Sequence, residues 1–105
     1  MSPERLAAMA VTEQYLIGEL SWRLGQLADA MPDVTTAREV ARLRRRCESC
    51  TLAELVVVLR NALGVADTAC WESLAAGDAI AFVHQSTASA DLYGFGVCAG
   101  LIDDS

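Results

Sequence analysis

The sequence is poor in the residues from which most catalytic and polyanion-binding sites are built. Its 105 residues contain no lysine and a single histidine, His84, and 14 acidic residues against 8 basic ones give a formal net charge of −6. The general basic footprint of a nucleic-acid or anionic-membrane binder is therefore absent, which leaves only local patches to consider. No nucleophile, base and orienting group can be assembled from these residues by any spacing rule. We therefore expect that the protein is not an enzyme and needs no cofactor.

Long hydrophobic runs are also lacking. The longest apolar runs, 79–83 and 95–102, fall far short of the roughly 20 residues that a helix needs to cross a bilayer. The first residues carry Glu4 and Glu13 among apolar neighbours and lack the basic region and the unbroken apolar region of a signal peptide. We therefore expect a cytoplasmic protein with no membrane span, in which the cysteines stay reduced or bind metal rather than form disulfides.

Strand-forming patterns and chain breakers are equally scarce. Both prolines, Pro3 and Pro32, lie in the first third of the chain, and β-branched residues rarely alternate with polar ones. Helix-forming residues dominate instead. With 53% hydrophobic residues, the chain is long enough for one core and too short for two domains. We expect an all-α protein, a compact bundle of about five helices that occupies residues 1–105 as a single helical domain.

The first predicted helix is a long one. Ser2 can cap it with Pro3 at its first position, and the helical pattern runs to about Met31, just before Pro32. Its apolar residues recur at alternating steps of four and three, a heptad spacing that only Glu13 interrupts. This seam consists of Leu6, Ala10, Ile17, Leu20, Leu24, Leu27 and Met31. Such a helix would reach about 45 Å, longer than a compact monomer of this mass covers, so we expect a partner surface along it.

Residues that typically cap a helix at its N-terminus or end it at its C-terminus predict the remaining helices. Thr51 followed by Glu54 forms a capping box, and the helix behind it is apolar nearly all round, which places it at the centre of the bundle. The predicted ranges are a second helix from Thr35 or Thr36 to about Glu48, a third from Thr51 to a stop at Gly64, a fourth from Asp67 that kinks or ends at Gly77, and a last one from Ser89 to Ile102.

The first helix carries the main functional hypothesis. Tyr15 and Trp22 lie off its leucine seam and project along one flank, either as interface anchors or as caps on the bundle core. Burial of the seam leucines against another chain would contribute roughly 1.5 to 3 kcal/mol per side chain before ordering costs, whereas an intramolecular hairpin could bury the same residues. The predicted interface consists of Tyr15, Ile17, Leu20, Trp22, Leu24 and Leu27. We expect a small accessory or protein-interaction module, either a homo-oligomer through this helix or a subunit for another protein partner.

A CxxC motif at Cys47 and Cys50 is the sharpest local signal for chemistry. Two thiolates at this spacing can hold zinc, and Cys70 with His84 would complete a tetrahedral site. Strong zinc signatures pair two close couplets, however, and here the second pair is fourteen residues apart. A redox dithiol is a further alternative because Cys50 precedes a predicted helix, although the strand that precedes thioredoxin-like motifs is missing. The remaining alternative is that the cysteines simply fill a tight core.

The second predicted helix holds the one basic patch, which consists of Arg38, Arg42, Arg44, Arg45 and Arg46. With a short turn and a capped helix behind it, this patch allows a helix-turn-helix hypothesis in which the arginines contact the phosphates of nucleic acid. Against it, the following helix is too apolar to lie in a groove, and the net charge opposes approach to DNA. The alternatives are a solvated helix face or a contact with an acidic partner.

Overall fold

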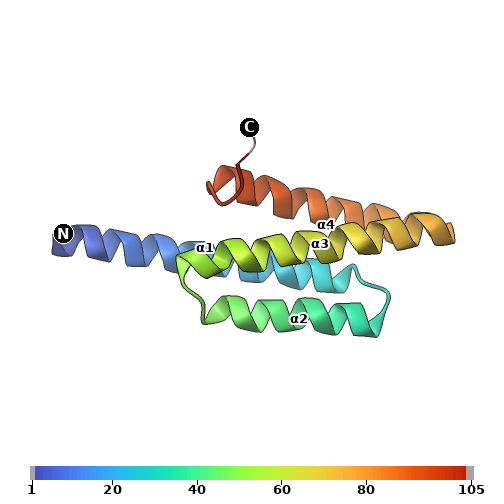
Figure 1. Cartoon of the computed structure of the whole chain (residues 1–105), viewed down its shortest axis with the longest axis horizontal. Helices are drawn as coiled ribbons and strands as arrows, with labels where there is room; N and C mark the ends of the chain where they lie inside the picture. The colour runs from blue at the N-terminus through green and yellow to red at the C-terminus, as the bar shows by residue number, and fades with distance from the viewer. Residues whose placement is uncertain (1, 104–105) are drawn as a thin grey trace.

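The structure is a computed structural model that describes the backbone of residues 2–103 and the side chains of residues 2–4 and 12–103. It contains four helices, α1 (Pro3–Asp29), α2 (Val34–Glu48), α3 (Leu52–Ala76) and α4 (Ala79–Cys98) (Figure 1). No strand occurs among the described residues, so the all-helical prediction is confirmed there. None of the described helices is long and apolar enough to cross a membrane.

Polar side chains cap the helices at their N-termini. Thr51 caps α3 as predicted, and its hydroxyl accepts a hydrogen bond from a backbone N–H in the first turn. Asp33 caps α2 in the same way, so this helix begins before the predicted caps Thr35 and Thr36. Asp78 caps α4. These caps satisfy backbone amides that have no partner inside their own helix.

The prediction of five helices is wrong, because α3 and α4 each run through residues that were expected to end or begin a helix. Gly64 and Asp67 lie inside α3, and Ser89 lies inside α4. A glycine inside a helix costs only about 1 kcal/mol relative to alanine, less than the apolar face on both sides of Gly64 contributes by its burial. That buried face consists of Leu55, Val58, Leu59, Ala62, Ala66 and Ala69. The break falls instead at Gly77, whose φ of 74° lies in the left-handed region that glycine adopts without strain.

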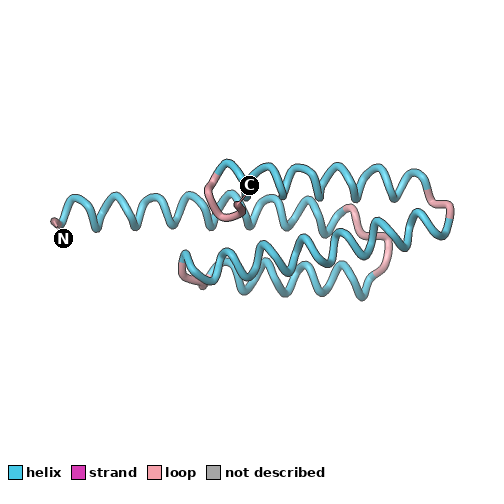
Figure 2. Tube along the Cα trace, turned by 45° about the horizontal axis from the view of Figure 1, so that its top comes forward, coloured by secondary structure: helices cyan, strands magenta, loops and turns pink. Residues whose placement is uncertain are grey.

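The four helices form two antiparallel hairpins that pack against each other (Figures 1 and 2). α1 pairs with α2 and α3 pairs with α4, while α1 also contacts α3 and α4, and α2 contacts α3. In the described chain α2 and α4 do not touch, so they lie at opposite edges of a flattened bundle that measures 55 × 29 × 16 Å. The N-terminal part of α1 runs on past the ends of the other helices.

The heptad seam of α1 is covered by the chain's own helices. Leu20, Leu24 and Leu27 are fully buried, and Ile17 is partly buried against the same core. These leucines therefore do not form the predicted intermolecular surface in the folded chain, and the intramolecular alternative is the correct one for them. The seam positions Leu6 and Ala10 lie outside the described side chains.

Candidate interaction surfaces

The α3–α4 hairpin carries an apolar groove of about 580 Å³, which we call the α3–α4 groove. It is lined by Leu63, Asp67, Cys70, Trp71, Leu74, Phe82, Ser86, Ser89, Ala90 and Tyr93. Three large side chains of this lining remain in solvent, with exposed fractions of 65% for Trp71, 53% for Leu74 and 44% for Tyr93. Clustered exposure of large apolar side chains is typical of surfaces that bind a partner.

Helical periodicity places these side chains side by side. On α3 the lining positions 63, 67, 70, 71 and 74 share one face, and on α4 positions 82, 86, 89, 90 and 93 share another. The neighbouring core stripe of α3 is built mostly from small residues, Ala62, Ala66, Ala69 and Ser73. Small core residues let the adjacent helices approach closely, which leaves the larger Trp71 and Leu74 outside the core.

The α3–α4 groove is nearly uncharged. Asp67 is the one charged residue in its lining, and the hydroxyl of Ser86 is already bonded to the backbone carbonyl of Val83. Burial raises the pKa of the Cys70 thiol, and the carboxylate of Asp67 raises it further, so this thiol stays protonated at neutral pH. The groove is thus an apolar surface with one carboxylate and one protonated thiol.

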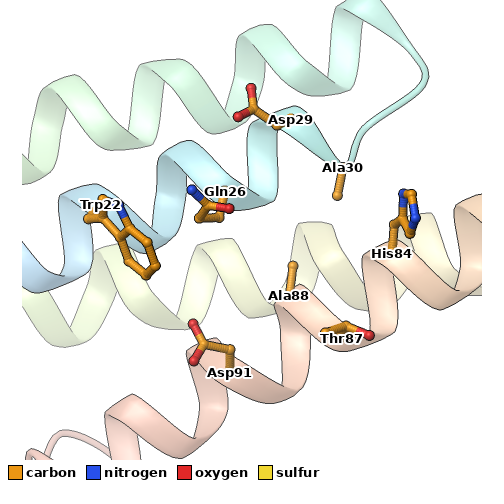
Figure 3. A pocket seen from close by; sticks show the side chains of 8 residues that line it. All are labelled: Trp22, Gln26, Asp29, Ala30, His84, Thr87, Ala88 and Asp91. Atoms are coloured by element: carbon orange, nitrogen blue, oxygen red, sulfur yellow. The ribbon is translucent and has the colours of Figure 1, made fainter.

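A second groove, of about 490 Å³, runs between α1 and α4. Figure 3 shows its two walls, with Trp22, Gln26 and Asp29 of α1 and the following Ala30 on one side, and His84, Thr87, Ala88 and Asp91 of α4 on the other. Trp22 is 58% exposed, and Tyr15 lines a further groove between the same two helices. Both aromatics therefore lie on the α1–α4 side of the bundle, outside its core. Carboxylates on both walls make this surface more acidic than the α3–α4 groove.

Arg23 links α1 to α4 beside these aromatics. Its guanidinium pairs with Glu19, and its Nε lies 3.3 Å from Oδ2 of Asp91. That Nε is buried without a hydrogen-bond partner among the described residues, so its contact with Asp91 is electrostatic and poorly aligned. The guanidinium also lies 4.7 Å from the ring centroid of Phe95. The hydrogen bond from Arg23 lowers the pKa of Glu19. This cation is occupied within the fold and is not free to bind a ligand.

The arginines of α2 divide into two groups. Nε of Arg44 donates to Oγ of Ser21 at 3.2 Å, which ties α2 to α1. Four others, Arg38, Arg42, Arg45 and Arg46, are exposed, and no hydrogen bond or ion pair joins their side chains to another described residue. These four residues, which we call the arginine face, form a cluster of cations that no acidic side chain of the described chain neutralises.

The geometry of α2 and α3 differs from the predicted helix-turn-helix. The two helices run antiparallel and side by side (Figures 1 and 2), whereas the helices of that motif cross at about 90–120°. α3 is also a core helix, with one face buried along its length. It does not project as a recognition helix would.

The four predicted zinc ligands do not come together. Cys47 and Cys50 lie near each other at the end of α2, Cys70 lines the α3–α4 groove, and His84 lies on the α1–α4 groove. No group of three or more metal-binding side chains forms among the described residues. The prediction took Cys47 and Cys50 from their spacing but added Cys70 and His84 on residue type alone, and the helices turn these two side chains to different surfaces.

Both thiols of the CxxC motif are buried. The Cys50 Sγ donates to the Cys47 carbonyl at 3.1 Å, and the Cys47 Sγ donates to the Ile17 carbonyl at 3.7 Å. Burial, followed by the neighbouring Cys50 and Glu48, raises the pKa of Cys47 to about 12. A redox dithiol needs an accessible thiolate. This pair instead has the environment of small core residues.

Comparisons of the chain with protein-family models, with curated proteins and with solved structures find no match.

Sequence reasoning missed the α3–α4 groove because it divided α3 at Gly64. A continuous helix through Gly64 aligns Leu63 with Cys70 and Leu74 on one face, next to the stripe of small core residues. The signal that could have revealed the groove was this pair of adjacent apolar stripes, one built from small residues and the other from larger ones. Two such stripes on one helix indicate a second packing surface.

Proposed function

We propose that this protein is a non-catalytic interaction module that pairs with a second copy of itself through the α3–α4 groove. The observation that carries the proposal is the exposed Trp71 beside Leu74, on a groove whose lining has a single charged residue. Self-association was expected through the α1 seam. Leu20, Leu24 and Leu27 are buried in the folded chain, whereas the α3–α4 groove leaves large apolar side chains exposed to a second copy.

The exposed aromatic area is consistent with a dimer anchor. A fully exposed aromatic side chain offers about 150–250 Å², so Trp71 and Tyr93 at their exposed fractions still offer on the order of 250 Å² together. This is about a third of the roughly 800 Å² that each partner buries in a standard interface. The apolar walls of the groove supply further area around these two anchors.

The net charge of the protein opposes self-association least at the α3–α4 groove. Two molecules that each carry a net charge of −6 repel one another, and the repulsion is weakest where the facing surfaces have few charges. In a two-fold arrangement the α3–α4 groove of one copy meets the same groove of the other. Asp67 is then the only lining carboxylate that each copy has to keep at the solvated rim.

Tryptophan fluorescence tests this proposal directly because the chain has two tryptophans. A Trp22→Phe variant reports Trp71 alone, and a Trp71→Phe variant reports Trp22 alone. As the protein is concentrated from nanomolar to high micromolar, we expect the Trp71 emission to shift to shorter wavelength and the Trp22 emission to stay unchanged. A concentration-independent Trp71 spectrum, or a shift confined to Trp22, would reject the groove as the self-association surface.

A further inference from the structure

The arginine face of α2 has no role in the proposed dimer. Its four side chains, Arg38, Arg42, Arg45 and Arg46, lie on the side of α2 opposite the buried Val40 and Cys47. No acidic side chain of the described chain pairs with them. A cluster of cations left uncompensated on an otherwise acidic protein marks a site for an external anion.

The spacing along α2 is regular. Arg38, Arg42 and Arg46 are four residues apart, so their positions rise in steps of about 6 Å along the helix axis. Arg45 lies beside this row, at the i+3 position from Arg42. The row thus presents guanidinium groups over about 12 Å of one helix face.

The fold keeps this face open. α2 lies at one edge of the flattened bundle, across from α4, which does not touch it in the described chain (Figure 1). Arg60 is the one basic residue that follows Thr51 in the sequence, so α3 and α4 carry much of the excess negative charge. An anion that approaches the edge formed by α2 meets the positive side of an asymmetric molecule.

We infer that the arginine face binds an acidic helical segment of a partner protein. Carboxylates on successive helical turns repeat at the same step of about 6 Å, and a guanidinium can bind a carboxylate through two parallel hydrogen bonds. A partner helix with acidic residues four apart therefore matches the row of Arg38, Arg42 and Arg46.

A nucleic acid matches this face less well. α2 contains no aromatic side chain on which a base could stack. The net charge of −6 repels an extended polyanion more strongly than a short acidic segment.

Fluorescence anisotropy of three labelled probes with the full chain tests the inference. The first probe is an alanine-based helical peptide with glutamate at every fourth position. The second has the same composition with its glutamates in one block, and the third is a short DNA duplex. We expect the first peptide to bind most tightly and its binding to weaken as salt is added.

Variants distinguish binding by the arginine face from a general effect of the protein's net charge. Arg42→Ala removes one ion pair that the first peptide would form with the arginine face, and it should weaken binding of that peptide by about threefold. The matched control Arg60→Ala, which removes an exposed arginine of α3, should leave binding nearly unchanged. Equal losses in both variants, tighter binding of the duplex than of the peptide, or no peptide binding at low salt would each overturn the inference. Retained peptide binding by a Trp71→Ser variant is expected, since the inference does not depend on the dimer.

Discussion

The hydroxyl of Ser73 on α3 donates a hydrogen bond of 2.7 Å to Oε1 of Gln85 on α4, and Gln85 is only 1% exposed. This polar pair joins the two helices that build the α3–α4 groove, and it lies in a core that is otherwise almost wholly apolar. A buried hydrogen bond is modest in net value but costly to break on one side. The pair therefore fixes how α3 and α4 pack together.

Removal of one partner of this pair should cost more stability than removal of both. Ser73→Ala leaves the Gln85 carbonyl oxygen without its donor, so we expect a loss of about 1–3 kcal/mol in the free energy of unfolding. Adding Gln85→Leu should recover part of that loss, since the buried polar atoms are then gone. Urea denaturation of the two single variants and the double variant measures this coupling. A Ser73→Ala variant as stable as the wild type would show that the hydrogen bond is not formed in solution.

Two glycines of α4 should respond to alanine in opposite directions. A Cβ on Gly94 would meet no atom within 4 Å, so Gly94→Ala should gain about 0.5–1 kcal/mol from the higher helix propensity of alanine. A Cβ on Gly96 would lie 2.6 Å from Ile102 Cδ1 and 2.7 Å from Leu59 Cδ2. Gly96→Ala should therefore lose about 1–3 kcal/mol through overpacking. Thermal unfolding followed by circular dichroism compares them, and a stabilised Gly96→Ala would contradict the packing described for this site.

The buried thiol of Cys47 should make stability fall at alkaline pH. Its folded pKa, raised by burial to about 12, lies above the value of about 8.5 expected in the unfolded chain. The contribution of this thiol is therefore complete below about pH 8.5 and is lost as the pH rises toward 12. Urea unfolding of the reduced protein between these limits should show a steeper decline for the wild type than for Cys47→Val. Parallel declines in the two proteins would show that Cys47 ionises as easily in the folded chain as in the unfolded one.

Local signals predicted part of this fold. The helical start near Pro3, the interruption after α1 and the cap at Thr51 depend on neighbouring residues, and the structure contains all three. The continuity of α3 depends instead on what surrounds Gly64. The small cost of a glycine inside the helix is outweighed by burial of the α3 face in the core, which a local stretch of sequence does not reveal.

The candidate sites were harder to predict than the helices. A leucine seam is the same pattern whether its partner is another chain or a second helix of the same chain, so the fate of Leu20, Leu24 and Leu27 depended on the tertiary fold. The arginine cluster was visible in the sequence, yet the separation of Arg44 from the arginine face required its contact with Ser21. Likewise, residue types alone suggested a site for Cys70 and His84, whereas helix orientation separates them.

Sedimentation equilibrium of three proteins tests whether two copies pair through the α3–α4 groove. Trp71→Ser removes the proposed anchor, while Trp22→Ser is a matched control that removes a similarly exposed tryptophan from the α1–α4 side. Both side chains lie mostly in solvent, so circular dichroism should show that both variants stay folded. We expect a mass near twice 11.2 kDa for the wild type and for Trp22→Ser, and 11.2 kDa for Trp71→Ser. A wild type that remains at 11.2 kDa at every concentration, or a dimer that survives in Trp71→Ser, would contradict pairing through this groove.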